Sequence, residues 1–416
     1  TPSSIFYLNS LFFLPIIKYY AFYIPTLLIM GFSNLILISK IFSNLKKRNI
    51  NYSFYLAILF FAFINIFFYR IQEHGTDRSA QILVFILILQ LINLIDFKKG
   101  YQLQIDYILI TLGIIISLKA FYILYLVIAI PIMWIFYKQK KLRIVLDIFK
   151  NKIFYLFISL LFITLLIYFL NTGCLIYPLY QTCFDNFNWS LGTAEAIKMN
   201  NHYQLWSKAG LTPSFRIEDP ELYLVNFNWV SNWFDLYFFN KMTDFLLGLT
   251  FLSIICLLIF YKKKRLKINF NKNILFIFFV IFLLTIEWFI NHPALRYGGY
   301  VLIASLILLP VSMIISKYNI SVKDLYKRLS ILFVIVILIF VTRNLNRIHK
   351  EVKQYNYKPI LNSLYFMDQS HFRINDSMNK LILNLKNCEN NSNECDKNLE
   401  LRIKRISSNR YIFIPE

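Results

Sequence analysis

Residues 153–170 read IFYLFISLLFITLLIYFL, a run without a single charged side chain. The hydrocarbon core of a bilayer is about 30 Å thick and needs about 20 apolar residues per helix, because lipid offers no partner to an unpaired backbone group. The run is therefore predicted to span a membrane. Nine further runs bring the predicted spans to ten, at approximately Tyr19–Phe42, Tyr52–Arg70, Ala80–Asp96, Leu103–Leu118, Ala120–Tyr137, Thr243–Phe260, Ile274–Ile290, Tyr297–Ser316 and Leu329–Val341.

The composition of the whole chain agrees with a membrane protein. Of its 416 residues, 58% are apolar and only 16% are charged, whereas soluble domains are near half apolar and a quarter charged. Gly, Pro and Cys number only 10, 11 and 5, which excludes collagen-like, disordered and disulfide-scaffold chains. The predicted fold class is an all-α integral membrane protein with about ten transmembrane helices.

The basic residues orient the predicted spans. The chain carries 44 Lys and Arg against 22 Asp and Glu, a formal net charge of +22. Most basic residues of the short loops fall in alternate loops, which the positive-inside rule places in the cytoplasm. Orientation and attraction to anionic lipids explain this charge better than nucleic-acid binding does. The predicted cytoplasmic loops are 43–51, 97–103, 138–152, 262–273 and 317–328.

This orientation divides the chain into four parts. Residues 1–171 and 242–345 hold the two halves of the helical bundle, while residues 172–241 and 346–416 lie outside, in the periplasm of a Gram-negative host. Because Trp and Tyr prefer the membrane interface, the aromatic loop 172–241 is expected to lie on the bilayer and cap the bundle. The tail is predicted to contain a helix over Met378–Leu385 and a strand over Arg410–Ile414.

The cysteines are placed as expected for an oxidising compartment. Cys174 and Cys183 lie together in the outside loop, and Cys388 and Cys395 lie together in the tail, whereas Cys256 lies within a span. Paired cysteines on one face of the membrane predict two local disulfides. The alternative is four unrelated thiols.

The familiar signatures of soluble enzymes are absent from the sequence: there is no phosphate-binding P-loop, HExxH or GxSxG motif. The first candidate site is instead Glu73-His74-Gly75-Thr76-Asp77-Arg78, between two spans. Its acids and its base could hold a divalent metal with a phosphate headgroup, or a sugar hydroxyl. Alternatively, it is a solvated turn in which Asp77 caps the next helix and Arg78 pairs with a lipid phosphate.

Two more candidates lie at the ends of other spans, where charged groups are costly and mark functional sites. Lys119 interrupts the apolar hairpin Leu103–Tyr137; it either extends to the membrane surface or points into a cavity that receives a lipid-linked phosphate. The third candidate runs from Glu287 through His292-Pro293-Ala294-Leu295-Arg296-Tyr297-Gly298-Gly299. Its arginine suits a phosphate or carboxylate, although a tight turn with an interfacial arginine explains the same residues.

Several segments have to be considered together, and they are Ile176-Tyr177-Pro178-Leu179-Tyr180, Asn188-Trp189-Ser190, Glu195-Ala196-Ile197, Trp206-Ser207-Lys208-Ala209-Gly210, the turn from His292 to Gly298, Thr76-Asp77, Leu118-Lys119-Ala120 and the tail cysteines. Together they resemble a family of large, poorly characterised bacterial membrane proteins. The resemblance covers nearly the whole chain and departs at Ala294, where an aspartate is expected.

That family is similar to the GT-C superfamily of polyprenyl-phosphate-sugar-dependent glycosyltransferases. The resemblance implies a helical bundle with a lipid-facing groove and an outside face where a sugar is transferred. It also implies an acidic residue in the first outside loop, as base or metal ligand. We expect that loop to lie upstream of Thr1, where a piece of the natural protein is expected, so Asp77 is a supporting candidate for the catalytic carboxylate.

The leading hypothesis is therefore a glycosyltransferase of cell-envelope glycan in the bacterial inner membrane, with membrane lipids, a polyprenyl-phosphate sugar and a glycan acceptor as partners. A transporter or flippase of lipid-linked sugars and a noncatalytic envelope scaffold are the alternatives. The transferase hypothesis predicts that Asp77, Arg78, Lys119 and Arg296 line one cavity beneath the loop around Trp189 and Trp206. Glu73, His74, Glu287 and His292 are supporting candidates, and a divalent metal is a possible cofactor.

Overall fold

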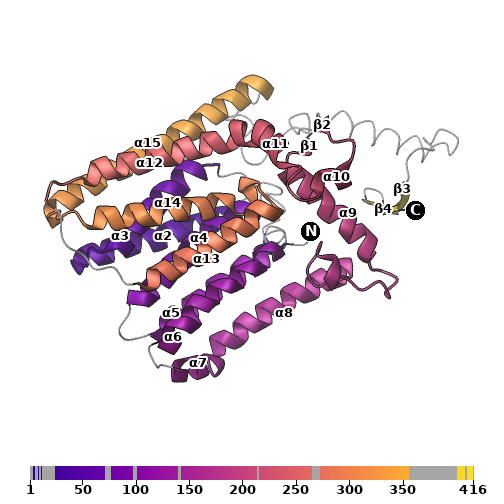
Figure 1. Ribbon diagram of the computed structural model, residues 1–416, viewed down its shortest axis with the longest axis horizontal. Coiled ribbons are helices and arrows are strands. Elements are labelled where there is room, and N and C mark those ends of the chain that lie inside the picture. The colour runs from indigo at the N-terminus through magenta and orange to yellow at the C-terminus, as the bar shows by residue number, and fades with distance from the viewer. Residues whose placement is uncertain are drawn as a thin grey trace. The chain divides into compact units, whose positions relative to one another are not determined.

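The computed structural model describes residues 24–70, 76–96, 101–138, 142–212, 215–264, 272–355, 401–407 and 410–415, together with Ser3, Ser4, Leu8 and Leu11. The chain forms two compact units, Thr1–Asn346 and Arg347–Glu416. The first unit is the helical bundle (Figure 1).

The all-α membrane fold is confirmed. Nine helical stretches of the described residues are long and apolar enough to cross a membrane, and α3 is a shorter apolar helix. The first half of the bundle comprises α2 (Ile24–Lys46), α3 (Tyr52–Phe67), α4 (Thr76–Asp96), α5 (Tyr101–Leu118), the 3₁₀ helix η2 (Ala120–Ile128), α6 (Ala129–Lys138), α7 (Leu142–Phe149) and α8 (Lys152–Thr172). The second half comprises α11 (Val230–Trp233), the π-helical turn η4 (Phe234–Met242), α12 (Thr243–Phe260), α13 (Asn273–Asn291), η5 (Leu295–Tyr297), α14 (Gly299–Ser316) and α15 (Val322–Tyr355).

Three predicted spans differ from the helices in ways that matter for the site. Helix α4 begins at Thr76 rather than Ala80, so Asp77 and Arg78 are helical. The predicted span from Ala120 starts as 3₁₀ helix and becomes α-helix only at Ala129. The span predicted from Thr243 continues a helix that starts at Val230, so the aromatic end of the loop is itself helical.

The core of the bundle is formed around α3, which is apolar on every face and buried from Tyr52 to Ile64. It packs against α2, α4 and α14. In contrast, α8 packs mainly on α5 and exposes large apolar side chains such as Phe162. Exposed apolar surface of this kind fits contact with lipid tails.

The segment between the two halves forms a small subdomain at the end of α8. Gly173 ends α8 with a φ of 76°, and a Cβ there would lie 2.0 Å from Oγ of Ser190, so glycine lets the following loop fold onto the helix. This segment contains η3 (Tyr180–Thr182), α9 (Gly192–Ser207), the short hairpin of β1 (Leu211–Thr212) and β2 (Phe215–Arg216), and α10 (Pro220–Leu224).

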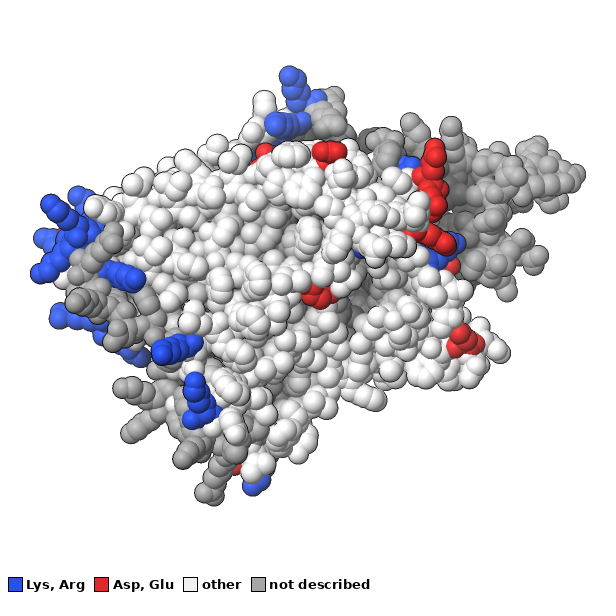
Figure 2. Space-filling model, viewed as in Figure 1, with Lys and Arg blue, Asp and Glu red and all other residues white. Residues whose placement is uncertain are grey.

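Lys and Arg gather at one end of the bundle, where α12 and α14 end and α15 begins (Figure 2). This is the end at which the sequence predicts cytoplasmic loops. The turn between α13 and α14 and the start of α4 lie at the other end (Figure 1).

In the second unit, β3 (Leu401–Ser407) and β4 (Arg410–Pro415) form an antiparallel hairpin, with Leu401 opposite Pro415. This confirms the strand predicted over Arg410–Ile414. The helix predicted over Met378–Leu385, and both Cys388 and Cys395, lie outside the described residues.

Candidate functional site

The buried carboxylate of Asp77 joins three segments that are far apart in the sequence. Asp77 lies in the first turn of α4 and is 5% exposed. Its Oδ1 accepts a hydrogen bond from Nζ of Lys119, and its Oδ2 lies 3.2 Å from both Nε and Nη2 of Arg296. Contacts to a guanidinium through two nitrogens fix its orientation as well as its charge. The structure thus brings Asp77, Lys119 and Arg296 together.

Lys119 points into the protein and not toward the membrane surface. It occupies the extended residue between α5 and η2, and its Nζ lies 4.5 Å from the centre of the Tyr297 ring. Burial lowers the pKa of Lys119, whereas the Asp77 carboxylate opposes this effect by stabilising the ammonium.

The turn that carries Arg296 is held through its backbone by buried aromatic side chains. Nε1 of Trp233 donates to the carbonyl of Pro293 and Nε1 of Trp288 to that of Ala294, both at 2.9 Å. The amide of Leu295 donates to the Tyr237 hydroxyl at 2.8 Å. Ala294, where an aspartate was expected, is buried and brings no carboxylate to this turn.

Two glycines allow this turn to pack closely. Gly298 has a φ of 105°, a conformation that L side chains rarely adopt. A Cβ on Gly299 would lie 2.5 Å from the Trp288 ring. The pair therefore lets the turn pack closely against α13.

A cavity of about 570 Å³ opens beside this cluster. The bundle contributes all of the charged residues of its lining, and the subdomain contributes the loop residues 176–179 and three polar residues of α9. The lining residues are Asp77, Lys119, Phe121, Ile123, Leu124, Tyr168, Ile176, Tyr177, Pro178, Leu179, Asn200, Tyr203, Gln204, Glu287, Asn291, His292, Arg296 and Tyr297.

Two supporting candidates, Glu287 and His292, also reach the cavity. Oε1 of Glu287 accepts a hydrogen bond of 2.9 Å from Nδ2 of Asn291. His292 packs edge-on against Phe121 and Tyr297, and Nδ1 of its ring has no hydrogen-bond partner among the described residues. Burial, with the charges of Lys208 and Lys119, lowers the pKa of His292 to about 4, so its imidazole is neutral at pH 7.

A disulfide shapes the wall of the cavity on the subdomain side. Cys174 and Cys183 are bonded, as the sequence predicted, and the loop between them supplies residues 176–179 to the lining. Trp189 and Trp206, which were expected above the cavity, do not line it and are about half exposed. The covering residues come instead from the disulfide loop and α9.

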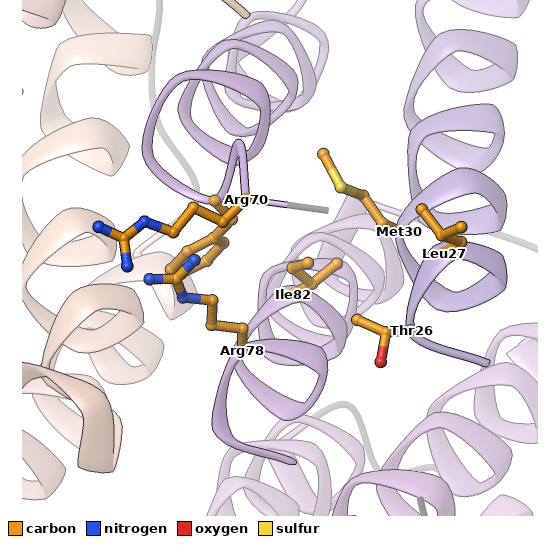
Figure 3. A pocket seen from close by; sticks show the side chains of 7 residues that line it. Thr26, Leu27, Met30, Arg70, Arg78 and Ile82 are labelled. Atoms are coloured by element: carbon orange, nitrogen blue, oxygen red, sulfur yellow. The ribbon is translucent and has the colours of Figure 1, made fainter. Parts of the chain in front are cut away.

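Arg78 does not line the cavity with Asp77, Lys119 and Arg296, as was predicted, but lines a separate small pocket. A helix turns by about 100° per residue, so Arg78 cannot share the direction of Asp77. Figure 3 shows its side chain beside that of Arg70, in a small pocket bounded by Thr26, Leu27 and Met30 of α2. Glu73 and His74 lie outside the described residues.

The candidate metal site gains no support from the residues that the structure describes. Among them, no three His, Cys, Asp or Glu side chains come together as metal ligands. Both oxygens of Asp77 face cations instead.

Residues 2–303 match a protein family described as Domain of unknown function (DUF8201). The chain belongs to this family. No curated protein and no solved structure matches it. The DUF8201 region contains every residue that lines the cavity, whereas α15 and the hairpin of the second unit lie beyond it.

Within the DUF8201 region, Gln81 is a positioning residue that the sequence analysis did not identify. It lies one helical turn after Asp77 and is fully buried. Its Nε2 donates to the carbonyl of Arg296 at 2.9 Å, and its Oε1 accepts from the amide of Val301 at 3.1 Å. The sequence signal that could have identified Gln81 is an amide four residues after an acid in a mostly apolar helix, since both side chains then face the same neighbouring segment.

Proposed function

We propose that this protein is a GT-C-like membrane glycosyltransferase that uses a polyprenyl-phosphate-linked sugar to build cell-envelope glycan. The observation that carries the proposal is the convergence of Asp77, Lys119 and Arg296 on one cavity at the end of the bundle away from the basic loops. A scaffold protein has no need of such a cluster, because buried ionic groups cost desolvation energy.

The charges of the cluster suit an anionic ligand. Two cations share the single carboxylate of Asp77, so the trio keeps a positive charge. The Arg296 side chain is 68% exposed and can turn toward a bound phosphate, while the rest of its turn is fixed. Lys119 and Arg296 are therefore assigned to the phosphate of the donor.

The cavity also has walls for the other parts of the substrates. Phe121, Ile123 and Leu124 of η2 form an apolar wall suited to the first units of a polyprenyl chain. Asn200 and Gln204 of α9 line the same cavity with amide groups that can bind sugar hydroxyls.

In the proposed reaction, the acceptor hydroxyl oxygen forms a bond to the anomeric carbon while the bond from that carbon to the phosphate oxygen breaks. The bonding electrons leave with the lipid phosphate, whose charge Lys119 and Arg296 stabilise. We assign Glu287 as the base that accepts the hydroxyl proton. Asp77 is already paired with two cations, whereas Oε2 of Glu287 forms no hydrogen bond among the described residues. Asp77 then positions the cations.

Binding of farnesyl phosphate to the purified protein in nanodiscs tests this assignment. We expect Lys119→Ala and Arg296→Ala each to weaken binding by about tenfold or more, the effect of about 1.4 kcal/mol from one lost charge-assisted contact. Glu287→Gln should bind normally yet form no glycan product in cells. Arg78→Ala is the matched control and should bind as the wild type does, since Arg78 lies beside Arg70 in a separate small pocket. Equal affinities for wild type, Lys119→Ala and Arg296→Ala would contradict the proposal.

The proposed location is the bacterial inner membrane, with the cavity and the C-terminus in the periplasm. A reporter fused after Lys264 should therefore be active in the cytoplasm, and one fused after Asn200 in the periplasm, because Lys264 belongs to a basic loop. Reporters on the same side of the membrane would contradict this topology.

A further inference from the structure

Lys208 is a buried lysine in the subdomain that covers the cavity. It follows the last turn of α9 and is only 4% exposed. Its Nζ lies 3.0 Å from Oε1 of Gln204 and 5.1 Å from the centre of the Trp229 ring. An ammonium has three donors, and Gln204 accepts one of them.

No carboxylate among the described residues forms a salt bridge with Lys208. A buried charge is costly unless it is paired, so lysines are rarely found in such a position. For comparison, Lys198 of the same helix is exposed and lies 3.8 Å from Glu195. Lys208 thus has the burial of a paired lysine without the acid that would pair it.

The backbone around Lys208 keeps the side chain in this position. The Tyr223 hydroxyl donates to the carbonyl of Lys208 at 2.6 Å, and Nδ2 of Asn232 donates to the carbonyl of Ala209 at 3.2 Å. Ala209 has a φ of 62°, which ends α9 and turns the chain back. The turn is therefore fixed from α10 and α11, and the side chain cannot easily swing into solvent.

Lys208 lies directly behind the wall of the cavity and does not itself line it. Gln204, its hydrogen-bond partner, lines the cavity, and so does His292, whose pKa the charge of Lys208 helps to lower after burial. The subdomain thus places a cation, separate from the Asp77 cluster, next to a residue of the cavity wall.

We propose that Lys208 and Gln204 form a second anion-binding site, which holds a carboxylate or phosphate substituent of the glycan acceptor. This inference rests on the proposed function, because it assumes that the donor phosphate occupies Lys119 and Arg296. A ligand anion at Lys208 supplies the missing partner of the ammonium and sets the acceptor on the subdomain side of the cavity. The acceptor is therefore an acidic or phosphorylated sugar.

Tryptophan fluorescence tests the site, because Trp229 contacts Lys208. Glucuronate, glucose 6-phosphate and neutral glucose are each titrated into the wild-type protein in nanodiscs. The same titrations are repeated with Lys208→Met and Lys208→Arg. We expect one or both anions to bind about tenfold or more tightly than glucose to the wild type and to Lys208→Arg, and this preference to be lost in Lys208→Met. Lys198→Met is the matched control and should keep it. Whichever anion is preferred identifies the substituent.

Two results would overturn the inference. One is an anion preference that survives in Lys208→Met, or is absent from the wild type. The other is a loss of binding confined to the donor. If Lys208→Met weakens the binding of farnesyl diphosphate but not that of either sugar anion, the site holds a second phosphate of the donor. Farnesyl phosphate should bind equally to the wild type and Lys208→Met. If it fails to bind the wild type, the proposed function fails while the sugar anions still test Lys208.

The pH dependence supplies a second readout. Burial lowers the pKa of Lys208 to about 8, so the cation that binds the anion is present below this pH and is lost above it. Two titratable groups near it, Tyr223 and His292, stay neutral between about pH 7 and pH 9, since burial raises the pKa of Tyr223 and that of His292 is about 4. Anion affinity should fall across this range in the wild type and stay constant in Lys208→Arg, whose guanidinium does not titrate.

Discussion

Asp77→Asn is expected to lower the free energy of unfolding by about 3 kcal/mol or more, the usual cost of removing one partner from a buried ion pair. The amide keeps the shape of the side chain but leaves the largely buried Lys119 without its counter-charge and loosens Arg296. This loss is measured by thermal unfolding of the protein in nanodiscs, monitored through the exposure of aromatic residues that are buried in the folded state.

Two further variants make the test specific. The double variant Asp77→Asn with Lys119→Met should recover much of the lost stability, because it removes both partners of the pair. Asp324→Asn is the matched control: that carboxylate also pairs with a lysine, Lys262, but both side chains are more than a third exposed, so no measurable change is expected. If the Asp77→Asn protein had the same melting temperature as the wild type, the central role of this carboxylate would be disproved.

Trp233→Ala is expected to have the second large effect, about 3–5 kcal/mol of lost stability for an aromatic side chain removed from the core. Trp233 is 2% exposed and stacks on Tyr237 at 5.7 Å. Its N–H also holds the Pro293 carbonyl, so the turn that carries Arg296 should loosen and the affinity for farnesyl phosphate should fall with the melting temperature.

Substitution by phenylalanine separates the two contributions of Trp233. Trp233→Phe keeps most of the apolar contact and loses the N–H, so its loss of stability should be smaller while the loss of farnesyl phosphate affinity persists. Trp206→Ala is the control, because Trp206 is 42% exposed. If Trp233→Ala and Trp206→Ala had equal effects, the bond to Pro293 would not position the turn.

The spans and the charged cluster followed from one physical rule, the high cost of polar groups in lipid. That rule picks out uncharged runs as helices, and it marks Lys119, Asp77 and Arg296 because each lies where an apolar run begins or ends. Arg78 satisfied the same rule and was placed wrongly, because its direction depends on the helix being regular from Thr76 onward. Residue type alone does not give that direction.

The covering subdomain was much less predictable. Its tryptophans were expected above the cavity, yet Trp189 and Trp206 do not line it, and the subdomain residues that do come from the disulfide loop and α9. From the sequence, Lys208 would be expected to be an ordinary exposed lysine of a loop. Its burial results from tertiary contacts of Tyr223 and Asn232 with the turn after α9, and no local pattern encodes such contacts.

The contact of Asp77 with both cations bears on how the proposed enzyme would complete its cycle. A pair of free cations would retain the lipid phosphate product tightly, and release would then limit turnover. In the proposed cycle Asp77 would compete with that phosphate for the two cations: as the product left, the carboxylate would pair again with Lys119 and Arg296, and no desolvated charge would remain unpaired. The proposed site would then bind the ground state less tightly and release the product faster.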